Sequence, residues 1–260
     1  MCIEVNGDTL VRFEGQDEYY AVPDGVRRLA DNAFYDRGRL IELTLPDSVT
    51  EIGDYAFKIC SNMVRLRLPA RVDRLGIGAF QQCRKLERVD LPEGVREIDA
   101  GMFVCCDFLS SLTIPATVQS IDPIAFATCR NLREIHIAPA QIDLLPDRQR
   151  VLAAITYMRE VDPAGKAGAG DATDDENVPA DGQSVIHAFI ADRAEQIGRI
   201  LIDGNDKKAL NYMIQQGLIG SAAASALLEQ ANKAHRTELA AMLLSRRRRG
   251  EELFEADPFA

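Results

Sequence analysis

Six cysteines are the first residues whose type and spacing could do chemistry, because clustered thiolates bind zinc. They are Cys2, Cys60, Cys83, Cys105, Cys106 and Cys129, and four of them recur at intervals of 23 residues. If each interval is one rung of a stack of strands about 4.8 Å apart, the first and last of these four lie about 14 Å apart. Four ligands of one zinc ion must each lie about 2.3 Å from it. The spacing therefore predicts no metal site, but a column of buried, reduced thiols that act as small apolar groups, with Cys2 and Cys105 exposed.

The histidines and the glycine-rich segment contain no recognisable catalytic or cofactor site. The chain has three histidines, His136, His187 and His235. None of them has a serine, cysteine or carboxylate beside it in a known nucleophile signature. The glycines at 165, 168 and 170 do not lie between a strand and a helix, as a nucleotide-binding loop requires, and the acidic run at 174–176 lacks the ligand order of a calcium loop. We therefore predict that the chain is not an enzyme and has no catalytic residue and no cofactor.

An internal repeat of 23 residues is the feature that must position these side chains. Proline recurs at Pro23, Pro46, Pro69, Pro92 and Pro115, and phenylalanine recurs at Phe34, Phe57, Phe80, Phe103 and Phe126. Aliphatic residues fill another column, at Leu43, Leu66, Val89, Leu112 and Ile135. So many columns in one register predict a solenoid, in which each rung buries its apolar groups only against its neighbours.

One rung can be followed from its residue types. Leu43-Thr44-Leu45 alternates with a period of two, which predicts a short strand with both leucines inward. Pro46 ends this strand, because it cannot donate a hydrogen bond to a ladder. Residues 56–60 then predict a short helical or 3₁₀ turn that points Phe57 and Cys60 into the core.

The repeat pattern Leu-x-x-Leu-x-Leu-Pro-x-x-Val-x-x-Ile-x-x-x-Ala-Phe-x-x-Cys-x-x-Leu resembles the BspA-type leucine-rich repeat over about half of the chain. The resemblance implies an α/β repeat solenoid, wound as a right-handed coil. It also implies an interaction protein of bacterial or protozoan type, often found at cell surfaces. The chain departs from the pattern at Arg37, where cysteine is expected, and at Ala30, Asp99 and Asp122, where other rungs have Gly53 and Gly76.

Five segments are predicted along the chain. Residues 1–17 form a hairpin cap, 18–145 the leucine-rich-repeat solenoid, 146–160 a capping helix, 161–182 a flexible linker and 183–260 an all-helical domain with a frayed tail. Part of the helical domain, 226–244, is similar to the helix pair of an ankyrin repeat, without the Thr-Pro-Leu-His opening. The four arginines at 246–249 suit a helix C-terminus, and contact with nucleic acid or an anionic membrane is the alternative.

The outward positions of the predicted strands are the candidate partner-binding face. The candidate residues are Arg65, Arg67, Arg84, Lys85, Arg88, Asp90, Glu134 and His136. The centre of this face is basic on an otherwise acidic protein, and arginine offers planar, bidentate contacts to carboxylates. We therefore expect a protein partner with an acidic surface. The competing interpretation is a solvated face of alternating charge.

The overall charge and the hydropathy pattern narrow the class of protein. The formal net charge is −10, and no segment is basic overall, which argues against nucleic acid as the main partner. No apolar run is long enough for a membrane span. The first residues lack the basic and apolar regions of a secretory signal, so we expect cytoplasmic residence, unless a leader is missing from this sequence. Three functions remain open: a non-catalytic protein-interaction scaffold, a cell-surface adhesion or host-binding protein, and an enzyme with an unrecognised site.

Overall fold

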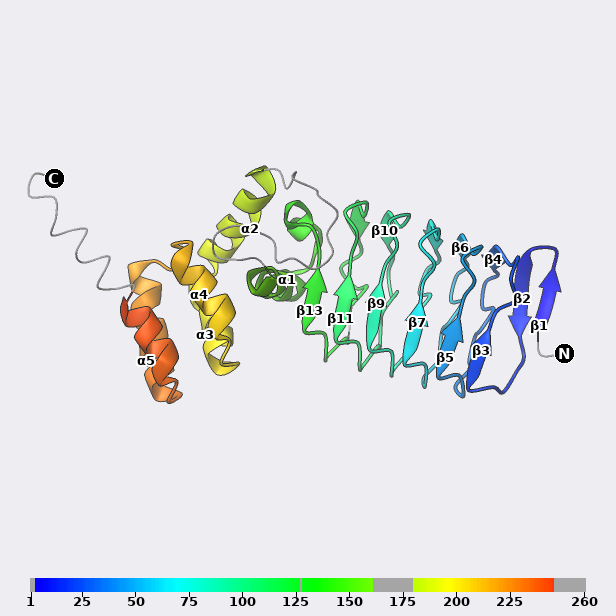
Figure 1. Ribbon diagram of the computed structural model, residues 1–260, viewed down its shortest axis with the longest axis horizontal. Helices are drawn as coiled ribbons and strands as arrows, with labels where there is room; N and C mark the ends of the chain where they lie inside the picture. The colour runs from blue at the N-terminus through cyan, green and yellow to red at the C-terminus, as the bar shows by residue number, and fades with distance from the viewer. Residues whose placement is uncertain (1–2, 127, 161–179, 246–260) are drawn as a thin grey trace, which may run out of the picture. The chain divides into compact units, whose positions relative to one another are not determined.

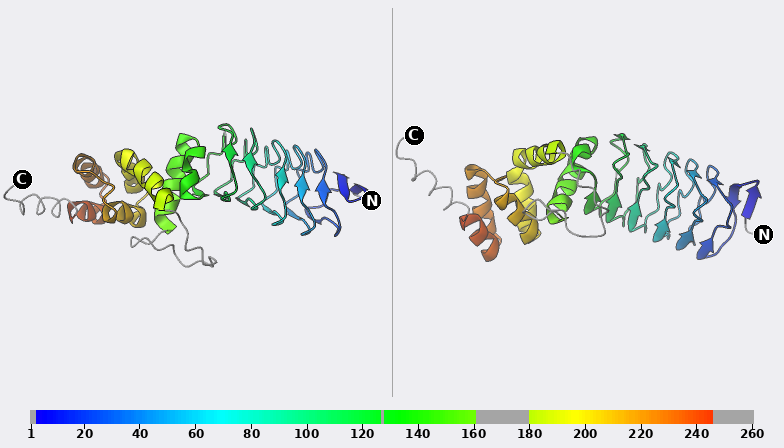
Figure 2. Two further views of the ribbon diagram at one scale, coloured as in Figure 1. Left: turned by 90° about the horizontal axis from the view of Figure 1, so that it is seen from above. Right: turned by 45° about the horizontal axis from the view of Figure 1, so that its top comes forward.

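The computed structural model describes residues 3–126, 128–160 and 180–245 (Figure 1). The chain divides into two compact units, Met1–Leu152 and Ala153–Ala260, and each is described by itself. The first unit is a stack of strand-containing rungs, seen from two further directions in Figure 2. The second unit is helical.

The first unit begins with the predicted hairpin. Strands β1 (Ile3–Asn6) and β2 (Thr9–Phe13) pair antiparallel, and Gly7 in the turn between them has a φ of 62°. Strand β2 also pairs parallel with the first rung, so the hairpin continues the stack. The ring of Phe13 lies 5.2 Å from the ring of Phe34, which covers the first phenylalanine of the repeat.

Two strands in every full rung make two faces of the solenoid. The first set contains β3 (Tyr19–Ala21), β5 (Glu42–Thr44), β7 (Arg65–Arg67), β9 (Arg88–Asp90), β11 (Ser111–Thr113) and β13 (Glu134–His136). The second set contains β4 (Arg28–Leu29), β6 (Glu51–Ile52), β8 (Arg74–Leu75), β10 (Glu97–Ile98) and β12 (Ser120–Ile121). Partners in each parallel pair are 23 residues apart, as Glu42 and Arg65 show, so the predicted rung length is confirmed.

The phenylalanine column is the centre of the core. Phe34, Phe57, Phe80 and Phe103 are fully buried. Successive rings from Phe34 to Phe126 lie 5.5–5.9 Å apart, and the planes become nearly parallel toward the C-terminal rungs. Such contacts add to the burial of the rings because offset stacking suits their quadrupoles.

The segment that carries each phenylalanine is a series of tight turns, so the predicted helical or 3₁₀ turn is wrong. Two residues of the segment around Phe57 have a left-handed backbone: Tyr55 with a φ of 56° and Ile59 with a φ of 64°. Equivalent residues in neighbouring rungs share this conformation, for example Gly78 and Gln82. A right-handed helix cannot contain such residues, so the chain turns repeatedly instead.

The cysteine column satisfies one main-chain carbonyl per rung. Cys83 Sγ donates to the carbonyl oxygen of Phe57 at 3.1 Å, and Cys106 Sγ donates to that of Phe80 at 3.1 Å. Cys60 and Cys129 make the same contact in their rungs. All four thiols are buried and free, as predicted, and burial raises the pKa of Cys60 to about 12.

Both strand ladders are interrupted at one place in the solenoid. The first set forms two sheets, β3-β5-β7 and β9-β11-β13, and the second set breaks between β8 and β10. Backbone bonds still cross this seam on the turn side, where Gln82 N donates to the carbonyl of Val104 at 2.8 Å. We call the boundary between β7/β8 and β9/β10 the seam.

The residues at the seam differ from those of the closed rungs before it. A Cβ added to Gly76 would lie 2.4 Å from the backbone nitrogen of Asp54 in the rung before it, and one added to Gly53 would lie 2.6 Å from the backbone nitrogen of Asp31. Asp99 has a Cβ at this position, whereas Gly53 and Gly76 do not. A second contact is lost as well, because the Asp54 carboxylate accepts from the Ile77 amide, and Ile77 has no acceptor for the next rung. The seam therefore coincides with a departure from glycine, although Ala30 and Asp122 bond to the preceding rung with their Cβ atoms in place.

The solenoid ends where the repeat pattern fails. A 3₁₀ helix, η1 (Pro139–Leu144), follows β13, and helix α1 (Asp147–Glu160) begins where a capping helix was predicted. The side chain of Gln141 replaces a valine of the repeat and donates to the carbonyl of Ala116 at 2.9 Å. The boundary between the two compact units falls within α1.

The second unit is helical, as the sequence predicts. It contains α2 (Ala180–Asp192), α3 (Ala194–Asp203), α4 (Lys207–Gln215), α5 (Ser221–Lys233) and a helix at 237–245. Helix α2 begins inside the predicted linker 161–182, and the rest of that linker lies outside the described residues. Two helix pairs have matching turns, since Asn205 and His235, 30 residues apart, both have a φ near 55°. The likeness to ankyrin repeats stays a prediction.

Candidate functional site

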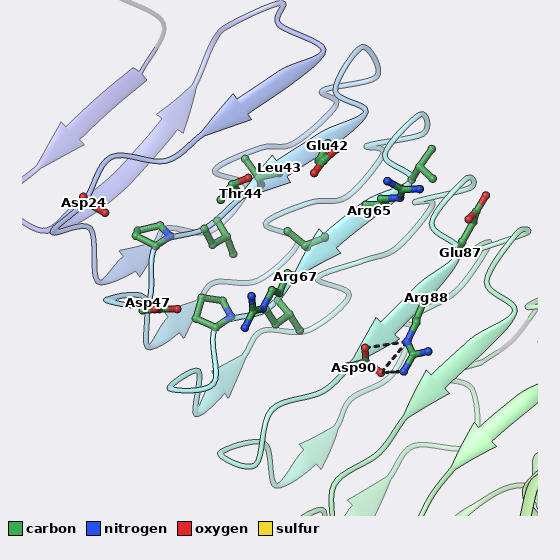
Figure 3. Close-up of a pocket in the computed structure, with 16 residues that line it drawn as sticks. Asp24, Glu42, Leu43, Thr44, Asp47, Arg65, Arg67, Glu87, Arg88 and Asp90 are labelled. Carbon is green, nitrogen blue, oxygen red and sulfur yellow. Dashed lines mark hydrogen bonds and ion pairs between the residues drawn. The ribbon is translucent and has the colours of Figure 1, made fainter. Parts of the chain in front are cut away.

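A hollow of about 950 Å³ lies on the outward face of strands β5, β7 and β9 (Figure 3). We call it the strand hollow. Its floor includes Leu66 and Leu68, which are 8% and 9% exposed, and two prolines close its end. Its charged lining residues are Asp24, Glu42, Asp47, Arg65, Arg67, Glu87, Arg88 and Asp90.

Strand alternation aims the central cations at this hollow. In β7, Leu66 is buried, while Arg65 and Arg67 on either side of it are exposed. The parallel register places Arg65 beside Glu42 and Arg67 beside Thr44. The strand hollow also lies over the seam, because both β7 and β9 contribute residues to its lining.

Arg88 and Asp90 neutralise each other within one strand. Arg88 Nε donates to Asp90 Oδ2 at 2.9 Å and Arg88 Nη2 donates to Asp90 Oδ1 at 3.0 Å. Partial burial opposes ionisation of Asp90, but the hydrogen bonds from Arg88 and Thr113 lower its pKa overall. The hydrogen bonds from Arg88 to Asp90, together with the charge of Asp90, raise the pKa of Arg88. Arg88 is therefore not the free cation that the sequence predicts.

Arg65 and Arg67 keep their charges available. Neither guanidinium has a hydrogen bond or ion pair with another residue in the described part of the chain. The acidic side chains of Glu42 and Glu87 line the hollow on the two sides of β7. The strand hollow is thus a pair of free cations with acids at its flanks, rather than a uniformly basic surface.

A second, smaller hollow adjoins the first. It has a volume of about 360 Å³ and is lined by Glu18, Arg39, Ile41, Asn62, Val64 and Lys85. Val64, the residue before β7, lines both hollows. Of its two cations, Lys85 was predicted from the sequence and Arg39 was not. The signal for Arg39 was present, because residues 39, 62 and 85 are one column of the 23-residue repeat.

The remaining predicted residues lie elsewhere on the face. Arg84 is exposed but lines neither of these two hollows. Glu134 and His136 are in β13, two strands beyond Arg88, and His136 is half-buried. The structure therefore brings together Arg65, Arg67 and the Arg88–Asp90 pair, with Lys85 in the adjoining hollow.

The other candidate groups are accounted for by packing. Within residues 3–126, 128–160 and 180–245, no cluster of His, Cys, Asp and Glu could hold a metal ion. His187 Nε2 lies 2.6 Å from the hydroxyl oxygen of Tyr212, and its ring meets those of Tyr157 and Tyr212 edge-on. Burial lowers the pKa of His187, which suits a neutral imidazole in a helical core. Cys2 and the arginines at 246–249 lie outside the described residues.

Among the residues described, none of the helices combines the length and apolar character that a bilayer crossing requires.

Comparison with known proteins identifies the repeat. Residues 18–144 match the description "BspA type Leucine rich repeat region", in six copies. No curated protein matches the chain.

The solved structures that are similar to this chain include bacterial leucine-rich-repeat proteins. A leucine-rich cell surface protein from Faecalibacterium prausnitzii is 31% identical, with a TM-score of 0.47, over 49% of this chain and 34% of that one. A leucine-rich-repeat protein from T. pallidum is 29% identical, with a TM-score of 0.41, over 49% of this chain and 73% of that one. The chain thus spans about a third of the length of the first of these proteins.

Proposed function

Because residues 18–144 are a leucine-rich-repeat region of the BspA type, we propose that this chain is a non-catalytic scaffold that binds a protein partner through its strand hollow. The observation that carries the proposal is the pair of free guanidinium groups on β7. They project from a rigid ladder, they have no partner among the described residues, and no core packing depends on them. Fixed, unpaired cations in a concave site favour an acidic group on a ligand, since arginine pairs with carboxylates in a planar, bidentate way.

The compartment is part of the same proposal. Five cysteines are free thiols in the described part of the chain, and Cys105 among them is partly exposed. Free thiols persist in reducing compartments, so we place the scaffold in the cytoplasm. Electrophoresis with and without reductant, on protein taken from its native source, should show the same mobility. A disulfide-linked species would contradict this placement.

A charge-reversal experiment tests the binding site. The double variant Arg65→Glu/Arg67→Glu should lose partners that the unchanged chain captures. Two carboxylates would replace the free cations beside Glu42 and Glu87, and they would repel an acidic partner. The matched control is Arg71→Glu/Arg96→Glu, which makes the same change in net charge at exposed positions that do not line the strand hollow. Captured proteins are compared by quantitative mass spectrometry.

Stability must be followed in the same samples. Both double variants change exposed side chains, so their thermal midpoints should stay close to that of the unchanged chain. Equal capture by all three chains would remove the strand hollow as the binding site. If both double variants lose captured proteins to the same extent, the change in net charge, and not a specific binding site, explains the loss.

A further inference from the structure

We propose that the occupant of the strand hollow is a single extended, acidic protein segment that lies along β7 and continues into the second hollow, from Arg67 past Arg65 to Arg39 and Lys85. This inference rests on the proposed function. It adds the chemistry of the partner, the direction in which the partner lies on the strand face, and its width.

The direction follows from the continuity of the two hollows. Val64 lines both of them and directly precedes the strand that carries Arg65 and Arg67. Arg39 and Lys85 line the second hollow from the rungs on either side of Asn62. None of these four cations has a hydrogen bond or ion pair with another residue where the structure describes the chain. The free positive charge therefore runs along β7 at Arg67 and Arg65 and then widens to the two neighbouring rungs at Arg39 and Lys85.

The spacing along this line suits an extended peptide. Arg65 and Arg67 are two residues apart on one strand, so their Cα atoms lie about 6.6 Å apart at about 3.3 Å per residue. An extended peptide presents every second side chain on one face with the same spacing. Carboxylates at alternate residues of such a segment would therefore meet the two guanidinium groups in register. A helix presents its same-face residues at different intervals and would not match.

The flanking acids limit the width of the partner. Asp24, Glu42 and Asp47 line the strand hollow on the side of β5, and Glu87 lines it on the side of β9. Arg88 and Asp90 contribute no net charge, because they form an ion pair with each other. A broad acidic surface would approach these carboxylates and be repelled, as like charges across an interface are unfavourable. One narrow acidic strand would meet the cations and avoid the flanks.

A single-stranded nucleic acid is the competing anionic strand. Such ligands bind through phosphate contacts together with stacking of bases on aromatic side chains. None of the residues that line the two hollows is aromatic. The chemistry of the lining therefore favours carboxylates over a polynucleotide.

Fluorescence anisotropy on the full chain tests the proposal with defined probes. The first probe is a labelled nonapeptide in which Glu alternates with Thr, and the second has the same composition with all Glu residues in one block. A labelled oligothymidylate of similar length is the third. We expect the alternating peptide to bind most tightly, by about fivefold over the block peptide, which corresponds to about 1 kcal/mol.

Two variants locate the bound peptide. Arg39→Gln/Lys85→Gln should weaken binding of the alternating peptide several-fold, although both residues lie outside the strand hollow. Arg71→Gln/Arg96→Gln removes the same charge at exposed positions outside both hollows and should leave binding unchanged. Added salt should weaken the binding, because exposed charges are screened over about 8 Å at physiological ionic strength.

The outcomes separate this inference from the function on which it rests. If the block peptide or the oligothymidylate binds as tightly as the alternating peptide, or if Arg39→Gln/Lys85→Gln has no effect, the extended acidic segment is wrong. In that case the strand hollow would still be supported as a binding site if the variant Arg65→Glu/Arg67→Glu no longer binds the natural partner. If that double reversal keeps every partner, the proposed function fails as well.

Discussion

Single buried side chains carry the stability of this solenoid, and Phe80 is the central one. Its ring is fully buried and lies between Phe57 at 5.6 Å and Phe103 at 5.5 Å. Phe80→Ala should lower the free energy of unfolding by about 3–5 kcal/mol, through lost burial and the cavity left behind. Chemical denaturation followed by circular dichroism measures this change. Phe108→Ala is the matched control, because Phe108 is 57% exposed, and its midpoint should move little. An unshifted midpoint for Phe80→Ala would contradict the stacked core.

His187 is the residue whose protonation should couple to folding of the helical unit. Its imidazole lies between Tyr157 and Tyr212, and burial lowers its pKa below the ordinary value of 6.5. The unfolded chain then takes up the proton more readily than the folded chain as the pH falls. The stabilising effect of the neutral ring is therefore complete above about pH 6.5 and decreases as the pH falls through and below that value.

The change His187→Gln isolates this effect. Glutamine can still hydrogen-bond to the Tyr212 hydroxyl but does not titrate. Thermal melts of the unchanged chain should show a midpoint that falls on acidification, and the variant should show a smaller fall over the same range. The same acid dependence in both chains would assign it to other groups.

At the scale of elements, the seam coincides with two residues, Asp99 and Ile77, that differ from their equivalents in the closed rungs before it. Gly53 N and Gly76 N donate to carbonyls of the preceding rung, at 2.9 Å and 2.8 Å. Asp99 occupies the equivalent position in its rung, and its pKa is raised by burial and by the nearby acids Glu97, Asp54 and Asp122. The Asp99 side chain thus adds a carboxyl group beside other acids at the position where Gly53 and Gly76 have no side chain.

The double variant Asp99→Gly/Ile77→Asp should close the seam. Glycine at position 99 removes the Cβ, and aspartate at position 77 supplies the acceptor that Asp54 supplies one rung earlier. The amide at position 99 should then exchange more slowly with deuterium, because it gains a ladder bond in β8–β10. Asp122→Gly is the control, since the amide of Asp122 already donates to Ile98 at 2.8 Å. Unchanged exchange at position 99 would mean that these two residues do not cause the break.

The repeat is the reason why most of the first unit could be predicted from the sequence. A column of identical residues gives the rung length, the inward positions and the stacking order at once, and Phe57, Phe80 and Cys83 lie where the columns place them. The seam could not be predicted, because aspartate occupies the same repeat position at Asp99 and at Asp122, and the ladder is interrupted only before Asp99. Distances between rungs at this precision are not encoded in a pattern of residue types.

The candidate site was predicted less completely for a related reason. The alternation of residue types correctly predicts that Arg65 and Arg67 are exposed. It does not show which exposed charges form ion pairs. Arg88 and Asp90 lie two residues apart on one strand face, and only their side-chain conformations decide that they pair. Arg39 was missed because the loop before a strand also contributes to the face.

At the scale of the whole molecule, a protease should cut the chain inside the second of the two compact units, after α1. Their boundary falls within α1, and the sequence from 161 to 182 predicts a flexible linker because it is rich in Gly, Ala, Asp and Pro. Chains cleave most readily where the backbone is exposed and not held in secondary structure. Limited proteolysis should therefore cut first between residues 161 and 179 and leave two stable fragments. Mass spectrometry of the products gives the cut sites, and early cleavage inside the solenoid, for example at the seam, would contradict this prediction.

The same digest shows which unit binds. Arg39, Arg65, Arg67 and Lys85 all belong to the unit Met1–Leu152, so the N-terminal fragment should retain the affinity of the full chain for the alternating Glu-Thr peptide. The C-terminal fragment should bind it no better than the block peptide, because neither hollow contains a residue of that unit. Separation of the fragments by size exclusion, followed by anisotropy on each, makes the measurement. Binding found only in the helical fragment would move the site away from the strand face altogether.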